Sequence, residues 1–474
     1  MSLDWVQAVE QGESILSLAN RLNLPENSIV FGIANTLWDW GEADKAIPIL
    51  ERYLARDPDH VLQMAYLRCL ISVGGEDKLA IQQSVSDLHS SFRKRFQNHS
   101  VSDYGQHDMQ RNRPLKIGFL CTYSNLKPVE FSIVPMLRAL DRSKFNAYFF
   151  SLNQEGHPLL DEVCDEHVVL LDMDAHGVCR KIQEKGIDIL FDLNGILRDD
   201  FPFEVFAMRP APIQAGWWNT PLSCGIETVK YYFMDRSMLT PDHDDMFSEK
   251  IIGIPGNATL CYQLPDDYSL TPPPYISEGI FTFASFTALF KTNDMVLETW
   301  ARILKGSHNS RLFIKCRGAT SLRFQNRLVP ILEKFGIDLK RIFLMEEETF
   351  DVMMSRYSLV DLCLNTYSYG AGTTALNAVW QGIPTMTVAG ALPHARNTAS
   401  MMNDCGLDDF VSGDQEGYIQ GAIKHSIRPE LLAEIRPVLR DHVKANSTWL
   451  NPEKFTRNFE QACRLAWHDW IERQ

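Results

Sequence analysis

Residues 368–382, with the sequence SYGAGTTALNAVWQG, carry the clearest chemical signature in the chain. Gly370 and Gly372 precede Thr373 and Thr374, where a short apolar run leads into an expected helix. The first backbone N–H groups of a helix have no partner within it, and the helix dipole favours negative charge there. The glycines allow close approach to the backbone, and the hydroxyls add donors. This stretch predicts a site for an anion such as a phosphate, although a simple threonine helix cap uses the same residue types.

A second group of polar side chains follows the expected strand in IDILFDLNG, residues 187–195. Asp192 and Asn194 lie at the carboxyl end of this strand, which is the edge at which parallel sheets bind ligands. An aspartate at a strand end also commonly caps the loop that follows. Both interpretations stay open from the sequence: contact with an acceptor substrate, or a structural cap.

The composition is that of a folded protein with more than one domain. The chain has 474 residues, 45% of them hydrophobic and 22% charged, and single domains rarely exceed about 250–300 residues. Its formal net charge of −14 does not favour broad attraction to nucleic acid or to an anionic membrane. The chain also lacks an apolar run of roughly 18 residues and the residue order of a signal peptide. We therefore expect a cytoplasmic protein with no nucleic-acid or membrane partner.

The spacing of cysteine and histidine argues against a metal site. The ten cysteines form no C-x-x-C pair, and the 13 histidines form no H-E-x-x-H motif. Cysteines in apolar segments are typical of reduced core residues rather than of a disulfide framework or a zinc site. We expect no bound metal.

Residues 1–110 are expected to be helical throughout, and residues 29–60 resemble one tetratricopeptide repeat. Small and apolar residues recur there at the spacing of a helix, a tight turn and a second helix: Ala34, Leu37, Gly41, Ala46, Ile47, Leu50, Leu54 and Pro58. A less regular copy follows. One clear repeat predicts a short helical module rather than a long peptide-binding solenoid.

Strand and helix patterns alternate twice in the rest of the chain, after a polar linker near residues 99–113. Such alternation predicts a parallel, doubly wound sheet. We expect one Rossmann-like unit in residues 114–270, a second in residues 279–450, and a final helix in residues 451–474 that packs back onto them. The fold class is therefore α/β with an all-α N-terminal domain, and two such units bind ligands in the crevice between them.

Four stretches in this order resemble the catalytic region of glycosyltransferase family 41: residues 204–225, 248–256, 286–305 and 361–390. The resemblance covers the chain from about Pro114 to its end. The family includes protein O-GlcNAc transferases with tetratricopeptide repeats and bacterial adhesin N-glycosyltransferases. It implies a GT-B arrangement of two Rossmann-like units, the first on the acceptor side and the second on the sugar-nucleotide side. It also implies a UDP-sugar donor, no metal or other cofactor, and inversion at the anomeric carbon.

The resemblance assigns roles to several residues. Lys291 in FTALFKT matches the lysine that meets the donor diphosphate in the family, and Thr373 and Thr374 match its Thr-Thr pair at a helix start. A departing diphosphate gains negative charge, which a metal-free enzyme must offset with a cation or with aligned N–H groups. Arg396 matches a family arginine and is expected, with His394, just before the helix that follows.

Other positions depart from the family pattern. Gly372 replaces the usual histidine before the threonines, and Asn377 replaces an aspartate that holds the donor ribose. Phe350 and Met353 stand where a lysine and a histidine face the uridine, so they either stack on the base or pack in a core. Lys127 replaces a histidine proposed as the base, and an ordinary lysine is protonated at neutral pH and cannot accept a proton. Lys127 could instead bind phosphate.

The sequence thus predicts an inverting, metal-independent glycosyltransferase of bacterial type. It would move a hexose or N-acetylhexosamine from a UDP-sugar to a Ser/Thr or Asn side chain of a protein, such as a flagellin or another secreted protein, which the N-terminal helices help to recognise. Two alternatives remain from the altered positions: a GT-B binding or scaffold protein that has lost catalysis, and an enzyme that uses a different nucleotide-sugar donor.

Overall fold

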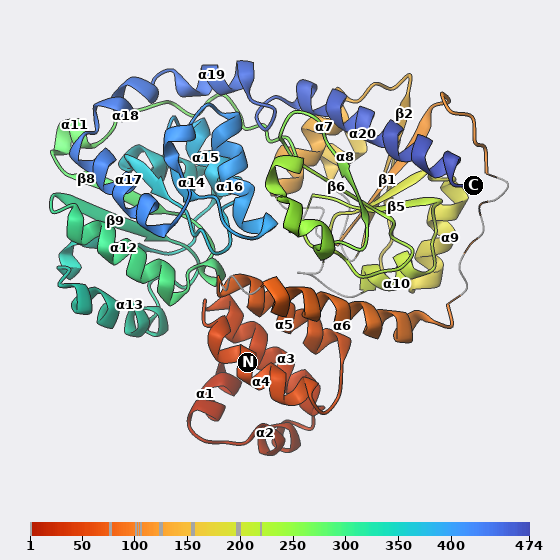
Figure 1. The fold of residues 1–474 in the computed structure, drawn as a ribbon, viewed down its shortest axis with the longest axis horizontal. Coiled ribbons are helices and arrows are strands. Elements are labelled where there is room, and N and C mark those ends of the chain that lie inside the picture. Colours follow the sequence, from red (N-terminus) through yellow and green to blue (C-terminus); the bar gives the residue numbers. More distant parts are fainter. Residues whose placement is uncertain are drawn as a thin grey trace. The chain divides into compact units, whose positions relative to one another are not determined.

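The computed structural model describes residues 2–74, 78–99, 102, 104, 107–122, 127–152, 157–195, 201–218 and 220–474. They form two compact units, each built around its own parallel sheet (Figure 1). Residues 82–263 and 447–474 make up one unit, and residues 1–81 and 264–446 make up the other. The chain therefore passes between the units three times, after residues 81, 263 and 446. The sequence places the corresponding boundaries near residues 110, 270 and 450.

The unit of residues 82–263 and 447–474 contains a seven-stranded parallel sheet. Its strand order is β3 (Glu166–Val169), β2 (Phe145–Ser151), β1 (Leu115–Cys121), β4 (Ile189–Asp192), β5 (Ile213–Gly216), β6 (Tyr231–Met234) and β7 (Lys250–Gly253). A π-helical turn (Val129–Ile133) leads into α7 (Val134–Ala139), and the remaining helices are α8 (Pro158–Val163), α9 (Ala175–Lys185), α10 (Phe201–Ala207) and α20 (Pro452–Glu472). Reversal of strand order at β1 and β4 is the doubly wound pattern that the alternation predicts.

The last helix, α20, belongs to this unit although it is far from it in sequence. It packs on α7, β5 and β7. Phe455 and Phe459 of α20 lie against Trp217, which follows β5; the Trp217 and Phe459 rings are 4.6 Å apart. All three side chains are fully buried, and each such side chain contributes about 1.5–3 kcal/mol through burial.

The unit of residues 1–81 and 264–446 contains a six-stranded parallel sheet. Its order is β10 (Ile342–Met345), β9 (Ser310–Lys315), β8 (Phe281–Ser285), β11 (Leu362–Leu364), β12 (Thr385–Val388) and β13 (Val411–Ser412). Within residues 264–446, the helices of this unit are α11 (Tyr275–Glu278), α12 (Asp294–Gly306), α13 (Leu322–Phe335), α14 (Phe350–Arg356), α15 (Thr373–Trp380), α16 (Pro393–Asp404), α17 (Gln415–Ile427), α18 (Glu430–Ile435) and α19 (Leu439–Asn446). Asn293 and Ser321 cap α12 and α13 with their side chains, as expected at helix starts.

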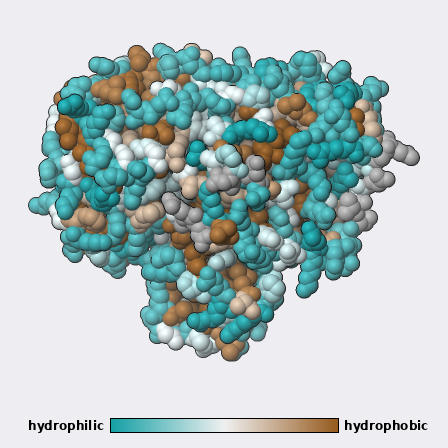
Figure 2. All heavy atoms as spheres, in the orientation of Figure 1, coloured by the Kyte–Doolittle hydropathy of each residue, from teal (hydrophilic) through white to brown (hydrophobic). Residues whose placement is uncertain are grey.

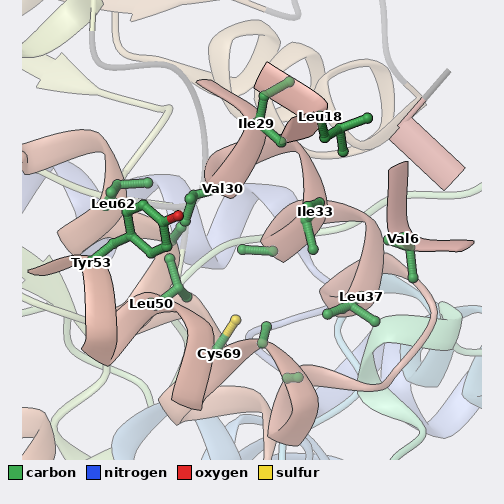
Figure 3. Packing of buried hydrophobic residues seen from close by; sticks show 14 of the residues in the cluster. Val6, Leu18, Ile29, Val30, Ile33, Leu37, Leu50, Tyr53, Leu62 and Cys69 are labelled. Carbon is green, nitrogen blue, oxygen red and sulfur yellow. The ribbon is translucent and has the colours of Figure 1, made fainter. Parts of the chain in front are cut away.

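The N-terminal helices belong to the same unit as the six-stranded sheet. They are α1 (Ser2–Glu10), α2 (Ile15–Leu22), α3 (Glu26–Asp39), α4 (Ala43–Leu54) and α5 (His60–Ser72), and α6 (Lys78–Phe96) begins here and continues into the other unit. Figure 3 shows their buried side chains gathered between the helices, among them Ile29, Ile33 and Leu50. The tight turn between α3 and α4 contains Gly41, which has a φ of 71°. The helix, tight turn and second helix that residues 29–60 predict are thus present. The resemblance of this segment to a tetratricopeptide repeat stays a prediction.

The predicted fold class, α/β with two Rossmann-like units and N-terminal helices, is confirmed. Hydrophilic side chains cover most of the face drawn in Figure 2, as the charged fraction of the chain leads us to expect. Within the described ranges, no helix has the length and apolar character needed to cross a membrane.

Candidate active site

Lys291 lies at the carboxyl edge of the six-stranded sheet, in the short 3₁₀ turn Leu289–Lys291 that follows β8. Its Nζ donates a hydrogen bond of 2.8 Å to the carbonyl of Gly370 and lies 4.4 Å from the centre of the Tyr369 ring. Burial of the ammonium lowers the pKa of Lys291 to about 7. Lys291 therefore lies beside the glycine-rich loop, and an anion bound there would favour its charged form.

Hydrogen bonds fix the glycine-rich loop just before Gly372, the N-cap residue of α15. The N–H of Ala371 donates to Asn365 Oδ1 at 2.7 Å, and Thr398 Oγ1 donates to the carbonyl of Ala371 at 2.8 Å. A Cβ on Gly370 would lie only 3.1 Å from Thr398 Oγ1. These contacts fix the direction in which the first turn of α15 presents its N–H groups.

Thr373 and Thr374 begin α15 and offer open donors. Within the part of the chain that the structure describes, their backbone N–H groups and hydroxyls make no hydrogen bond to protein acceptors. The carbonyl of Thr374 accepts a 3.0 Å hydrogen bond from the Tyr357 hydroxyl. The structure thus brings together the Lys291 ammonium and the free donors of an eight-residue helix, and this combination suits a diphosphate.

Asn377 and Arg396 flank this region on α15 and α16. Asn377 is 2% exposed, and its Oδ1 has no partner among the described residues. Arg396 donates from Nη1 to the carbonyl of Gly390 at 3.1 Å. The expectation that His394 and Arg396 precede the helix is wrong, because α16 already begins at Pro393, a residue that suits the first helical position. His394 is buried against α5, where its Nε2 lies 3.3 Å from the Ile71 carbonyl.

Phe350 and Met353 lie on α14, and both side chains are half-buried. Tyr357, which follows α14, contacts the start of α15 through its hydroxyl. The two side chains therefore belong to the same unit as Lys291, Thr373 and Thr374, and they are neither fully packed in a core nor fully exposed. Their role toward a base stays a prediction.

The candidates from the first sheet have different surroundings. Lys127 is exposed, its Nζ lies 2.8 Å from Glu130 Oε2, and it lies over the Phe131 ring. Asp192 is 3% exposed and accepts hydrogen bonds from the N–H groups of Asn194 (2.9 Å) and Gly195 (3.1 Å). Burial raises the pKa of Asp192, although these hydrogen bonds oppose the shift.

Asn194 completes the same loop structure. Its Oδ1 accepts from the backbone N–H of Thr122 at 2.8 Å, and its Nδ2 donates to the carbonyl of Leu120 at 3.2 Å. Asp192 and Asn194 thus join the carboxyl ends of β4 and β1. These contacts are those of the capping alternative.

Sequence reasoning missed the support that the N-terminal helices give to Lys291. The Trp38 ring of α3 stacks on Phe290, the neighbour of Lys291, at 4.3 Å. Trp38 Nε1 donates to Ser72 Oγ at 2.8 Å, and Asn293 Nδ2 donates to the Ser72 carbonyl at 3.1 Å. Asn293 also reaches Ser368, at the start of the glycine-rich loop. The helices therefore hold both segments that carry the site, and only the conspicuous WDWG run at the end of α3 hints at this in the sequence.

The resemblance implies a UDP-sugar donor, and we expect Trp38→Leu to weaken binding of UDP about three- to tenfold, because loss of the stack frees the turn that carries Lys291. A small displacement of a charged group from its ligand is enough for such a change. Trp5→Leu is the matched control, since Trp5 is a half-buried tryptophan of the same helices that packs over Gly32. Equal losses in both variants would show that only the integrity of the helices matters. Titration calorimetry with UDP measures both.

A metal site is not found in the described part of the chain. No group of three or more His, Cys, Asp or Glu side chains is placed there so that it could hold an ion. Lys291 and the backbone N–H and hydroxyl donors of Thr373 and Thr374 are the groups that would meet the charge of an anion at α15.

A cation beside a glycine-rich helix start, at the carboxyl edge of a Rossmann-like sheet, is typical of α/β proteins that bind nucleotides. The chain belongs to glycosyl transferase family 41, whose model matches residues 72–260 and 271–459. The resemblance that the sequence motifs show is thereby confirmed.

Known proteins are similar over most of the chain. A probable UDP-N-acetylglucosamine–peptide N-acetylglucosaminyltransferase SPINDLY of Arabidopsis thaliana is 30% identical over 76% of this chain and 40% of its own length. A protein of the same description from Solanum lycopersicum is 28% identical over 85% of this chain and 43% of its own length. The chain thus spans less than half the length of these curated relatives. A solved O-GlcNAc transferase of Thermobaculum terrenum has a TM-score of 0.85 and 26% identity, over 94% of this chain and 85% of that one, which supports the GT-B fold class.

Proposed function

We propose that the chain is a glycosyltransferase that moves a sugar from a UDP-sugar to a side chain of a protein. The observation that carries the proposal is the Lys291 ammonium beside the free N–H groups and hydroxyls of Thr373 and Thr374. The printed descriptions of the relatives, which name UDP-N-acetylglucosamine and a peptide, support a UDP-sugar donor and a protein acceptor. N-acetylglucosamine is therefore the first sugar to test among hexoses and N-acetylhexosamines.

In such a transfer, the acceptor oxygen or nitrogen attacks the anomeric carbon and the bond from that carbon to the diphosphate oxygen breaks. The leaving electron pair stays on the diphosphate, whose charge grows. Lys291 and the start of α15 would stabilise that charge because their donors are already oriented by the loop. The acceptor proton passes to a base that this chain leaves unassigned, since Lys127 is paired with Glu130 and Asp192 caps a loop.

Donor binding tests the proposal. Thermal unfolding of the full chain is measured with UDP, UDP-N-acetylglucosamine, UDP-glucose, GDP and ADP. A ligand at about 100 times its dissociation constant stabilises the folded state by about 2.7 kcal/mol, which shifts the midpoint by a few degrees. A shift with a UDP-sugar, lost in Lys291→Ala, supports the proposal.

Two other candidates correspond to the remaining outcomes. A shift with another nucleotide only would indicate an enzyme with a different donor, which the replacements at Phe350, Met353 and Asn377 also allow. No shift with any nucleotide would favour a scaffold without catalysis. The acceptor atom (Ser/Thr or Asn), the acceptor protein (a flagellin or another secreted protein), recognition by the N-terminal helices and a cytoplasmic location stay predictions.

The threonine hydroxyls give a more local prediction. We expect Thr373→Val and Thr374→Val each to weaken UDP binding about ten- to a hundredfold, because each loses one hydrogen bond to a charged group. Uridine, which lacks phosphate, is the control ligand and should bind the variants and the parent chain equally. If uridine binding falls as much as UDP binding, the hydroxyls do not act on the diphosphate.

A further inference from the structure

The unit with the seven-stranded sheet contains a cavity of about 900 Å³ that the proposed transfer does not use. Its walls come from α6, from the segments that enter β5 and β6, and from the end of α20. Pro212 and Lys230 line it, and they immediately precede β5 and β6 respectively. The cavity therefore opens at the amino edge of the sheet. Asp192 lies at the opposite, carboxyl edge, where parallel sheets usually bind substrates.

The buried wall of this cavity combines aromatic rings with an unused donor. Trp470 of α20 is 4% exposed, and its indole N–H has no acceptor among the residues described. Phe92 and Phe96 of α6 line the same space, with ring centres 5.7 Å apart. A buried donor without a partner costs about 1–3 kcal/mol, so this site favours a ligand that brings an acceptor atom together with apolar surface.

The rim of the cavity is positively charged, in contrast to the net charge of −14 of the chain. Four cationic side chains line it: Arg93, Arg209, Lys230 and Arg473. Glu227 is the one carboxylate side chain among the lining residues, and it lies 3.9 Å from Arg93 with both side chains largely exposed, so this pair neutralises little. Lys230 is exposed and has no ion pair within the described ranges. Arg473 is paired with Asp469 of α20, since its Nε lies 3.0 Å from Asp469 Oδ2. The excess of positive charge at the rim therefore comes mainly from Arg209 and Lys230.

We propose that this cavity is a second ligand site, for a small organic anion that carries an apolar ring or chain and a carboxylate or phosphate group. The volume lies within the usual range of about 300–1,000 Å³ for small-molecule sites. The acceptor oxygen of the ligand meets the Trp470 N–H, its apolar part packs on Phe92 and Phe96, and Lys230 attracts the negative charge. The site is independent of Lys291 and of the proposed sugar transfer.

Titration calorimetry of the full chain with phenyl phosphate tests this site, in the presence of saturating UDP so that any donor site is occupied. Inorganic phosphate and benzyl alcohol supply the charge and the ring separately. We expect saturable binding of one phenyl phosphate and at least tenfold weaker binding of either part. Equal binding of inorganic phosphate, or no binding of phenyl phosphate, would overturn the proposal.

Variants locate the binding. Trp470→Phe keeps an aromatic ring but removes the N–H, and Lys230→Gln removes one rim charge; each should weaken phenyl phosphate binding about fivefold. Lys144→Gln is the matched control, because Lys144 is an exposed lysine of the same unit outside the cavity. Lys291→Ala should leave binding of phenyl phosphate unchanged. If this variant no longer bound phenyl phosphate, the ligand would lie at α15 instead. If the acidic peptide Glu-Asp-Phe-Asp-Glu bound more tightly than phenyl phosphate, the cavity would be a peptide site and the proposal would be contradicted.

Discussion

Lys291→Ala is expected to lower the rate of donor cleavage at least about a hundredfold. The ammonium of Lys291 is the one cationic group that the structure places on the glycine-rich loop, through its hydrogen bond to Gly370, in the part of the chain described. Removal of a single preoriented donor from a developing oxyanion costs about 10²–10³ in rate, and a charged donor should reach the upper part of that range. The rate of donor cleavage is measured as release of UDP from the UDP-sugar that shifts the unfolding midpoint of the chain. The measurement can be made with an acceptor or, as hydrolysis of the donor, without one.

The control for this variant is Lys305→Ala, which removes an exposed lysine from the last turn of α12 in the same unit. It should retain the parental rate. The Lys291→Ala chain should unfold at about the same temperature as the parent, because loss of the hydrogen bond to Gly370 is offset by removal of a desolvated charge. An unchanged rate in Lys291→Ala would remove Lys291 from the site.

The same lysine predicts how donor binding depends on pH. Because burial lowers the pKa of Lys291 to about 7, the ammonium is charged below that pH in the unoccupied site and neutral above it. The diphosphate prefers the charged form, so the dissociation constant of UDP should rise between pH 7 and pH 9, by at most tenfold per pH unit. Phosphate groups change little in charge over this range, since their second pKa is about 6. Lys291→Ala should show no such dependence.

The folded chain alone has the opposite dependence. An unfolded lysine binds a proton up to its ordinary pKa of 10.5, whereas Lys291 in the folded chain releases it near pH 7. Unfolding therefore takes up protons between these values, and the contribution of Lys291 to the free energy of unfolding rises with pH. Donor binding and stability thus respond to pH in opposite directions through one group.

The sequence predicts the central strands and the anion site because both depend on local patterns. β1, β2 and β8 are short segments that are mostly apolar and mostly buried. The glycines and threonines of the anion site are neighbours in the sequence, so their position at a helix start can be predicted from that stretch alone. The short edge strands are harder: β3 is half-exposed, and β13 has two residues. Their pairing depends on the neighbouring strands of the sheet, so it cannot be predicted from the sequence of the segment itself.

Long-range contacts explain the rest of the site. The stack of Trp38 on Phe290 joins residues some 250 positions apart, and the packing of α20 on Trp217 does the same in the other unit. An aromatic residue on a helix predicts burial but not its partner. The loop-capping contacts of Asp192 equally depend on Leu120 in β1 and on Thr122 just after it, through Asn194.

Asp188→Asn is expected to destabilise the unit with the seven-stranded sheet by about 3–5 kcal/mol. Asp188 precedes β4, is 1% exposed and accepts hydrogen bonds from Arg113 Nη1 at 2.8 Å and from His107 Nε2 at 2.6 Å. The guanidinium of Arg113 also lies over the Trp467 ring of α20, at 4.6 Å. Removal of the Asp188 charge leaves the largely buried Arg113 with only a 3.4 Å pair to Asp108, whose side chain is more than half exposed. The loss of the buried partner accounts for the magnitude.

Hydrogen exchange of the amides in residues 107–118 measures this loss locally, so the second unit does not enter the result. Glu472→Gln is the control, because Glu472 pairs with Arg111 of the same segment at 2.7 Å but both side chains are more than half exposed. Exposed pairs contribute about 0–1 kcal/mol, so protection should barely change. Equal effects of the two substitutions would mean that burial of Asp188 adds nothing to the pair.

The effect of Asp188→Asn should also depend on pH. Burial alone would raise the pKa of Asp188, but the hydrogen bonds from Arg113 and His107 outweigh it and hold that pKa below its ordinary value of 3.8. The stabilisation is therefore present above the unfolded pKa and is lost as the pH falls through the lower, folded pKa. The difference between the parent and the variant should be complete near pH 6 and shrink below about pH 4, where a constant difference would exclude the charge of Asp188 as its cause.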